Sequence, residues 1–235
     1  MTKTTSIMAL AAGFLLGGAA AARAQTPDPR GYAELSIAGQ MQSNTVSSSS
    51  TFSLFGETGA TSFAQTVGNG LTFDGGGGYF VRKNLAIGGS VSMFTRSPAG
   101  TVSISTPDPI AFNSFTVTSA EPKLTHTELG MHVRVSYRVP IADKIDATIY
   151  GGPSFIRLSK QIASAVVTNG TSQIATETQT GMGVGVHGGV DLAYLFTRQV
   201  GGGIFVRYVG ATVDLPAASV SVGGLQAGLG LRLRF

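Results

Sequence analysis

The last thirteen residues of the chain, from Gly223 to Phe235, alternate between two kinds of side chain without a break. One set is apolar or glycine and ends in Phe235, while the other holds glycine, glutamine, Arg232 and Arg234. Successive side chains of a β-strand point to opposite faces, so the segment predicts a long strand with one apolar face and one polar, cationic face. Such a strand lies between two unlike environments. A membrane on one side and a polar lumen on the other is the hypothesis that the rest of the chain must support.

Eight segments of the chain alternate in the same way, each over about the 9 to 11 residues that a tilted transmembrane strand requires. The cleanest, 126–139, keeps the period over fourteen positions. The segments begin near Ala33, Leu71, Leu85, His126, Ile145, Met182, Val200 and Gly223. The predicted fold is therefore all-β, an eight-stranded antiparallel transmembrane β-barrel.

The connections between these segments fall into two classes. Short polar turns follow the second, fourth and sixth segments, whereas the other connections are longer and rich in Ser, Thr, Ala and Gly. The long connections cover about 41–70, 95–123, 158–180 and 213–219, and we expect them to be solvated surface loops rather than a second domain. Gly151-Gly152-Pro153 predicts a bulge or bend, because proline cannot donate to a β-ladder, and the register beyond it stays open.

The first 24 residues have the pattern of a cleaved export signal: a positive start at Lys3, an apolar stretch over 7–22, and the small-x-small sequence Ala22-Arg23-Ala24. We therefore assign 1–24 to a signal peptide and 25–235 to the barrel. Without Lys3 and Arg23 the formal charge falls from +4 to +2, so charge does not argue for a nucleic-acid partner. The chain contains no cysteine, which excludes disulfides and thiolate metal sites.

Alternation alone also fits a soluble lipocalin-like barrel with its apolar face inside. Three features favour the membrane: glycines crowd the polar face, charges of both signs lie on that face, and aromatic residues lie on the apolar face. Aromatic residues on the apolar face, expected near the short turns, would form an interfacial girdle. The expected girdle is Tyr79, Tyr137, Tyr194, Tyr208 and Phe235.

With the export signal, the segment 73–93 (FDGGGGYFVRKNLAIGGSVSM), the sequence Gly151-Gly152-Pro153-Ser154 and the ending 223–235, the chain resembles the small eight-stranded outer-membrane barrels of Gram-negative bacteria. That group includes the transmembrane domain of outer-membrane protein A, OmpX and OmpW. The resemblance implies a bacterial outer-membrane location, with both termini periplasmic. It also implies that Leu231, Leu233 and Phe235 form the signal read by the barrel-assembly machinery. The implied partners are that machinery, periplasmic chaperones, outer-membrane lipid and lipopolysaccharide.

Twelve ionisable residues are expected to face the lumen. They are Glu34, Asp74, Glu128, His132, Arg134, Arg138, Asp146, His187, Asp191, Arg207, Arg232 and Arg234. The interior of an eight-stranded barrel is only wide enough for side chains, so these charges must pair or meet water. One interpretation is a polar network that fills space and fixes the register, with Arg232 and Arg234 near Glu34 or Arg207. The other is a narrow ion or water path whose selectivity the charges tune.

Other chemistry is weakly indicated. His126, Glu128 and His132 alternate on one strand and would need His187 or Asp191 to complete a metal site. No serine lies in a recognisable nucleophile signature, and Gly75–Gly78 lacks the Lys and Ser or Thr of a phosphate-binding loop. We assign no catalytic residue, metal, cofactor or nucleic-acid partner, and leave the oligomeric state open.

The expected function is therefore a non-enzymatic outer-membrane barrel, either a structural and surface-exposed protein or a small porin-like pore. Two alternatives stay open: binding of a host or environmental ligand through the loops, and modification of lipid A. The second alternative would need reactive groups facing the membrane, whereas the histidines of this chain face inward.

Overall fold

The computed structural model describes residues 29–113, 115–168, 171–216 and 219–235. The predicted signal peptide, 1–24, lies outside the described residues. Within these residues the chain forms twelve β-strands, eight of which close into a barrel in the order β1-β12-β11-β10-β9-β8-β5-β4. No helix in the described ranges is long and apolar enough to cross a membrane.

The eight barrel strands correspond to the eight predicted segments, and the predicted fold class is confirmed. They are β1 (Gly31–Met41), β4 (Gly70–Phe80), β5 (Leu85–Arg96), β8 (His126–Ala142), β9 (Ile145–Thr168), β10 (Thr171–Leu195), β11 (Val200–Asp214) and β12 (Ser219–Arg234). The first and last strands pair antiparallel and close the ring, with Glu34 opposite Arg232 and Leu35 opposite Leu231. Closure removes the free sheet edges that a membrane would not tolerate.

The alternating pattern sets the two faces of the barrel as predicted. On β8, Val133 and Val135 are 49% and 51% exposed, whereas Arg134 between them is 4% exposed. The barrel therefore presents apolar side chains outward and polar ones inward, the arrangement that lipid outside and a polar lumen require.

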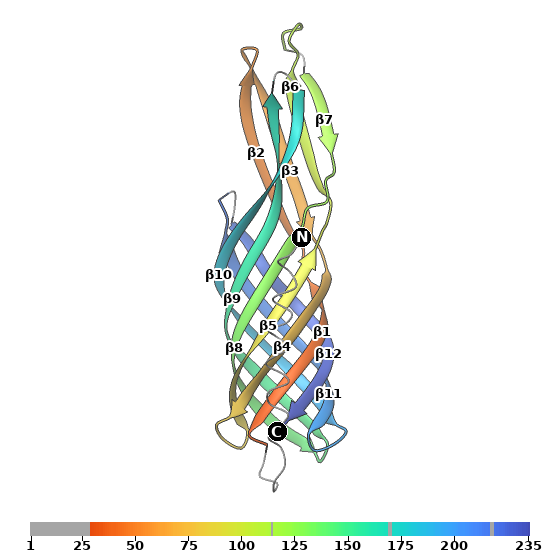
Figure 1. The fold of residues 1–235 in the computed structure, drawn as a ribbon, viewed down its shortest axis with the longest axis vertical. Helices are drawn as coiled ribbons and strands as arrows, with labels where there is room; N and C mark the ends of the chain where they lie inside the picture. Colours follow the sequence, from red (N-terminus) through yellow and green to blue (C-terminus); the bar gives the residue numbers. More distant parts are fainter. Residues whose placement is uncertain (1–28, 114, 169–170, 217–218) are drawn as a thin grey trace, which may run out of the picture.

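The two ends of the barrel differ. The three tight turns, at 81–84, 143–144 and 196–199, lie together with the C-terminus at one end (Figure 1), which we call the turn end. The opposite end, called the loop end, continues into further strands. These are β2 (Asn44–Leu54), β3 (Glu57–Val67), β6 (Gly100–Pro107) and β7 (Phe115–Ala120). They form a four-stranded sheet in the order β2-β3-β6-β7.

The expectation of solvated loops at the loop end was therefore wrong. The four-stranded sheet and the extension of the β9–β10 hairpin over 159–180 stand together above the barrel (Figure 1), and we call this structure the head. Phe63, Val102 and Ile104 of the sheet pack with Leu124 and with Ile162 of β9 in one buried apolar cluster. The head thus has its own apolar core, which explains why hydroxyl-rich segments form strands there.

Two smaller expectations also need correction. Tyr208 is not at a turn: it lies in the body of β11, opposite Gly188 and Leu225, so it does not belong to the girdle near the turn end. Pro153 lies within β9 without a register shift, because the pairings of β9 with β10 stay in frame on both sides of it. The irregularity between β8 and β9 is instead between Pro140 and Ala142, at the turn.

Candidate functional site

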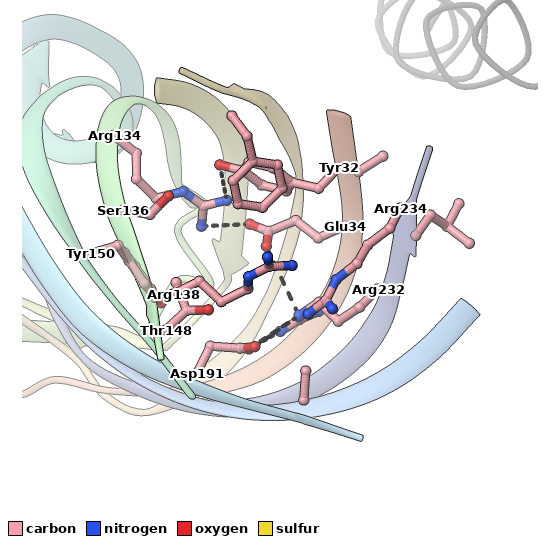
Figure 2. Close-up of a pocket in the computed structure, with 14 residues that line it drawn as sticks. Tyr32, Glu34, Arg134, Ser136, Arg138, Thr148, Tyr150, Asp191, Arg232 and Arg234 are labelled. Carbon is pink, nitrogen blue, oxygen red and sulfur yellow. Dashed lines mark hydrogen bonds and ion pairs between the residues drawn. The ribbon is translucent and has the colours of Figure 1, made fainter. Parts of the chain in front are cut away.

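The lumen at the turn end is crossed by a chain of ion pairs (Figure 2). Arg134 of β8 places Nη1 at 2.7 Å from Glu34 Oε1 of β1, and its Nη2 donates to the Tyr32 hydroxyl at 3.1 Å. Arg232 of β12 donates through Nε and Nη2 to the Asp191 carboxylate, and its Nε lies 3.9 Å from Glu34 Oε2. Five side chains from four strands are thereby linked across the barrel.

Two further arginines lie at the same end. Arg234 Nη1 is 2.6 Å from Asp146 Oδ2, which links the last strand to β9. Arg138 donates through Nη2 to the Lys83 carbonyl at 3.1 Å, and its guanidinium lies 4.9 Å from the centre of the Phe80 ring. The expectation that Arg232 lies near Glu34 agrees with this geometry, whereas Arg234 pairs with Asp146 rather than with Glu34.

The middle of the lumen is organised by Arg207, which is 2% exposed. Its Nη1 donates to Asp74 Oδ2 at 2.9 Å, while Nε and Nη2 both donate to Gln226 Oε1 at 2.9 and 2.6 Å. Gln226 Nε2 donates in turn to Gln40 Oε1 at 2.6 Å, and Ser90 Oγ donates to Asp74 at 3.2 Å. A buried ion pair is thus extended by neutral amides, which satisfies the hydrogen-bonding groups that the pair leaves over.

A histidine layer lies beside this network. Ser154 Oγ is 2.8 Å from His132 Nδ1 and 2.9 Å from His187 Nδ1, and His132 Nε2 is 2.8 Å from Ser92 Oγ. One hydroxyl therefore connects two imidazoles, and since it can donate only one proton, at least one of the two rings donates to it.

The proposed histidine metal site is not assembled. His126 Nε2 contacts Glu128 Oε1 at 2.7 Å, while His132 contacts His187 through Ser154. No group of three or more His, Asp or Glu side chains in the described part of the chain is arranged to hold a metal ion. Glu128 is instead held by the Gly223 N–H at 3.0 Å and by Gln40 and Gln42.

Above these polar layers, toward the loop end, the inner face becomes apolar. Ile156 and Leu158 of β9 pack with Val209 and Val213 of β11 and with other buried residues in one cluster. This cluster, which we call the apolar plug, is completed by Val46, Leu215, Val220 and Val222. The polar lumen that alternation predicted is therefore interrupted by an apolar wall on β9, β11 and β12, while Glu128, the register neighbour of Leu158, stays polar.

One buried cation, Lys160, is not part of these networks. Lys160 is fully buried, and its Nζ has no hydrogen-bond partner among the described residues. Its register neighbours on β8 and β10 are His126 and Gln179, whose Nδ1 and Oε1 atoms are also buried without a partner. Sequence reasoning missed Lys160 because it lies within the connection expected at 158–180.

Ser154 and the two glutamines were missed for different reasons. Ser154 follows Pro153, beyond which the sequence left the register open. Gln40 and Gln226 have the inward parity that places them in the lumen, yet their uncharged amides gave no signal that they would bridge Arg207 to the rest of the network. A prediction that counted every inward-facing polar residue, charged or not, would have included both glutamines among the lumen residues.

Several solved structures are similar to this chain. Neisserial surface protein A shares 16% identity over 87% of this chain and 97% of its own, with a TM-score of 0.43. OprG of Pseudomonas aeruginosa shares 10% over 91% and 99%, with a TM-score of 0.47. The outer membrane protease OmpT of Escherichia coli shares 9% over 91% and 99%, with a TM-score of 0.46. These scores all lie below 0.5, so they carry no conclusion about activity.

No curated protein matches the sequence. The family model of the outer membrane protein β-barrel domain, in contrast, matches residues 9–232, nearly the whole chain. That match agrees with the closed ring, the outward apolar face and the inward charges. The chain belongs to the outer membrane protein β-barrel domain family and is a protein of the bacterial outer membrane.

Proposed function

We propose that this protein is a closed, non-enzymatic outer-membrane barrel that carries the head at the cell surface. The observation that carries the proposal is the apolar plug, whose buried side chains from β9, β11 and β12 pack together inside the barrel beneath the head. In the orientation that the family plan implies, the turn end faces the periplasm and the head faces outward. Lipid and lipopolysaccharide would then surround the apolar band, and the assembly machinery with its chaperones would insert the barrel.

The side chains of the lumen argue against the porin-like alternative. A conducting path needs a continuous column of water, but Arg207, Asp74 and Gln226 are bonded to one another across the middle of the barrel. Beyond them, Leu158 and Val213 in the plug are both fully buried. Narrow apolar constrictions exclude water and so block ions.

Conductance across a planar bilayer tests this proposal. Purified protein without the signal peptide, folded in detergent and added to the bilayer, is expected to give no discrete openings, although it should shift on a gel between heated and unheated samples. The gel shift shows that the protein added was folded. Reproducible openings of one size from folded protein would refute the closed barrel and favour the pore.

The non-enzymatic part of the proposal rests on access. Ser154, the hydroxyl that contacts two imidazoles, is 0% exposed, so no substrate reaches it without opening the barrel. Lipid-facing residues such as Val133 and Ile149 are apolar and offer no nucleophile. Incubation with lipid A followed by mass analysis is expected to show no change in mass, whereas any released or transferred acyl chain would contradict the proposal.

Binding through the head is the second candidate, and the tip of the head favours it. Ile110 and Phe112 are 95% and 78% exposed, and Phe55 has a φ of 54°, a backbone conformation that is rare for a bulky residue. Asp108 accepts hydrogen bonds from the N–H groups of Ile110 and Ala111, which hold the turn and lower the pKa of its carboxyl. Exposed apolar side chains on such a turn are typical of contact sites.

Adhesion of cells that display the protein tests the second candidate. Cells producing the wild type are expected to adhere to host-cell layers more than cells producing the double variant Ile110→Ser, Phe112→Ser at equal surface levels. A matched control is Thr116→Ser on β7, which keeps the strand and changes no apolar side chain. Equal adhesion of all three would remove the tip as a binding surface.

A further inference from the structure

Positive charge is concentrated at the turn end. Among the described side chains, five exposed cations lie at the strand ends and turns there, against one exposed acidic side chain, Asp143. The five are Arg30, Arg82, Lys83, Lys144 and Arg198, which we call the cationic rim. The sheet of the head, in contrast, carries a single charged residue among its four strands, Glu57. The field of the molecule therefore attracts anions to its turn end.

A cavity lies inside the turn end of the barrel (Figure 2). Its charged lining residues are four arginines and two acids, which gives the lining a formal charge of +2. The four arginines are Arg134, Arg138, Arg232 and Arg234. One of them, Arg234, pairs with Asp146 just outside the lining.

Hydroxyl groups supply neutral donors in the same cavity. Ser136 of β8 is the register neighbour of Tyr150 on β9, and Arg138 is the neighbour of Thr148. Ser136 and Tyr150 are 5% and 7% exposed, and none of the three hydroxyls has a hydrogen-bond partner within the part of the chain that the structure describes. Buried hydroxyls usually find a partner, so those of Ser136 and Tyr150 are available to a ligand, together with that of the half-buried Thr148 in the same lining.

The size and position of the cavity limit what it can hold. Its volume is about 50 Å³, and since one water needs roughly 10–15 Å³ by the same measure, it has room for a few water-sized groups. A tetrahedral oxyanion is of this size. Ser136, Tyr150 and Arg232 belong to the inner face of the barrel, so the ligand must come from solution at the turn end, not from the lipid that surrounds the outer face.

We propose that this cavity is a binding site for a small soluble oxyanion, with inorganic phosphate or a phosphate monoester as the physiological class. Arginine is the side chain best suited to phosphate, because its planar donors match two oxygens at once. The cationic rim raises the local concentration of the anion, while Arg138 and the hydroxyls of Ser136 and Tyr150 contact it. This proposal goes beyond the proposed function, since a closed barrel needs no ligand at its turn end.

Calorimetric titration of the folded, full mature protein with inorganic phosphate tests the proposal. In a zwitterionic detergent and a phosphate-free buffer, we expect saturable binding of one phosphate per chain with a Kd in roughly the millimolar range. Arg138→Gln is expected to weaken binding about tenfold or more, because it removes a charged donor. Arg198→Gln removes the same charge from the cationic rim, away from the cavity, and is expected to change Kd by less than about threefold.

Two further sets of titrations distinguish a soluble phosphate from a lipid headgroup, and a defined site from general attraction by charge. Glycerol 1-phosphate is expected to bind and glycerol is not, whereas vesicles of phosphatidylglycerol should compete poorly because the cavity does not open to the lipid face. Tyr150→Phe, which leaves every charge in place, should weaken phosphate binding by a few-fold. The absence of saturable binding, or equal losses in Arg138→Gln and Arg198→Gln, would overturn the proposal, because equal losses indicate diffuse attraction and no site.

Discussion

The ion pair between Arg207 and Asp74 gives the sharpest test of how the lumen stabilises the barrel. The two side chains are 2% and 7% exposed and meet at 2.9 Å. Arg207→Met keeps most of the stem but leaves the Asp74 carboxylate buried without its cation. Asp74→Asn does the reverse. Removing one partner of a buried pair typically costs about 3–5 kcal/mol, because the remaining charge is uncompensated.

The double variant Asp74→Asn, Arg207→Met should then be no less stable than either single variant, because neither charge remains. With about 3 kcal/mol lost in each of the three variants, the coupling energy is about 3 kcal/mol, at the upper end for residues in contact. Urea unfolding in lipid vesicles measures these losses, followed by circular dichroism and by heat-dependent gel migration. Tryptophan fluorescence is not an option, since the chain has no tryptophan.

A surface control and a clear contrary result complete this experiment. Arg198→Met removes an exposed arginine at a turn and should change the free energy of unfolding by less than about 0.5 kcal/mol. If the losses of the two single variants simply add in the double variant, the charges are independently hydrated. The lumen would then contain water at this level, and the network around Arg207 would not block a water path through the barrel.

Three further predictions use the same unfolding assay. Leu158→Ala should cost about 2–5 kcal/mol by leaving a cavity in the apolar plug, clearly more than Met182→Ala on the outer face; equal costs would mean that the plug is not closely packed. Lys160→Met should raise stability by about 1 kcal/mol or more, because it removes a buried ammonium that has no hydrogen-bond partner in the described part of the chain; a loss of stability would show that bound water or an anion satisfies the lysine. Gly223→Ala should cost about 1–3 kcal/mol, since its φ is +92° and an added Cβ would meet the Val209 carbonyl, whereas Gly39 has only one atom near the 4 Å limit and should tolerate alanine.

The barrel itself could be predicted from the sequence because its determinant is local. In a closed membrane barrel every strand must separate lipid from lumen, so the period-two pattern recurs in each strand and can be recognised one segment at a time. The same pattern put Glu34 and Arg232 on the inner face, but it did not fix the register that sets them opposite each other on β1 and β12. Which charges pair was less predictable. Arg234 of β12 pairs with Asp146 of β9, a strand that is not its neighbour in the sheet, because the closed ring brings their inward side chains together.

The head could not be predicted in this way because its determinants are distant in sequence. Strand β2 contains the run Ser47–Ser50, whose composition is typical of a loop, and β3 is rich in Thr and Ala with few large apolar residues. These segments are strands because β3 pairs with β6, more than thirty residues away, and because Phe63 packs on Ile162 of the long hairpin. Non-local pairing and packing of this kind leave only a weak trace in any single segment.

The apolar plug shows that the rule of apolar side chains outside and polar side chains inside does not hold along the whole length of a strand. On β11 the outward residues change from Val206 and Tyr208 to Thr212 and Asp214, while the inward residues change from Arg207 to Val209 and Val213. The period of two continues across this point, but the apolar set passes from the outer to the inner face.

An inversion of this kind is what a strand requires when it leaves the bilayer. Below it, lipid lies outside and polar groups must be inside, whereas above it water lies outside and the core must be apolar. The same inversion occurs on β12, where outward Leu225 gives way to Ser221 and inward Gln226 gives way to Val222. The two strands are in register at this level, since Val209 pairs with Gly224. The inversion therefore places a boundary of the bilayer near Tyr208 on β11 and Leu225 on β12, and beyond it these two strands obey the rules of a water-soluble β-protein.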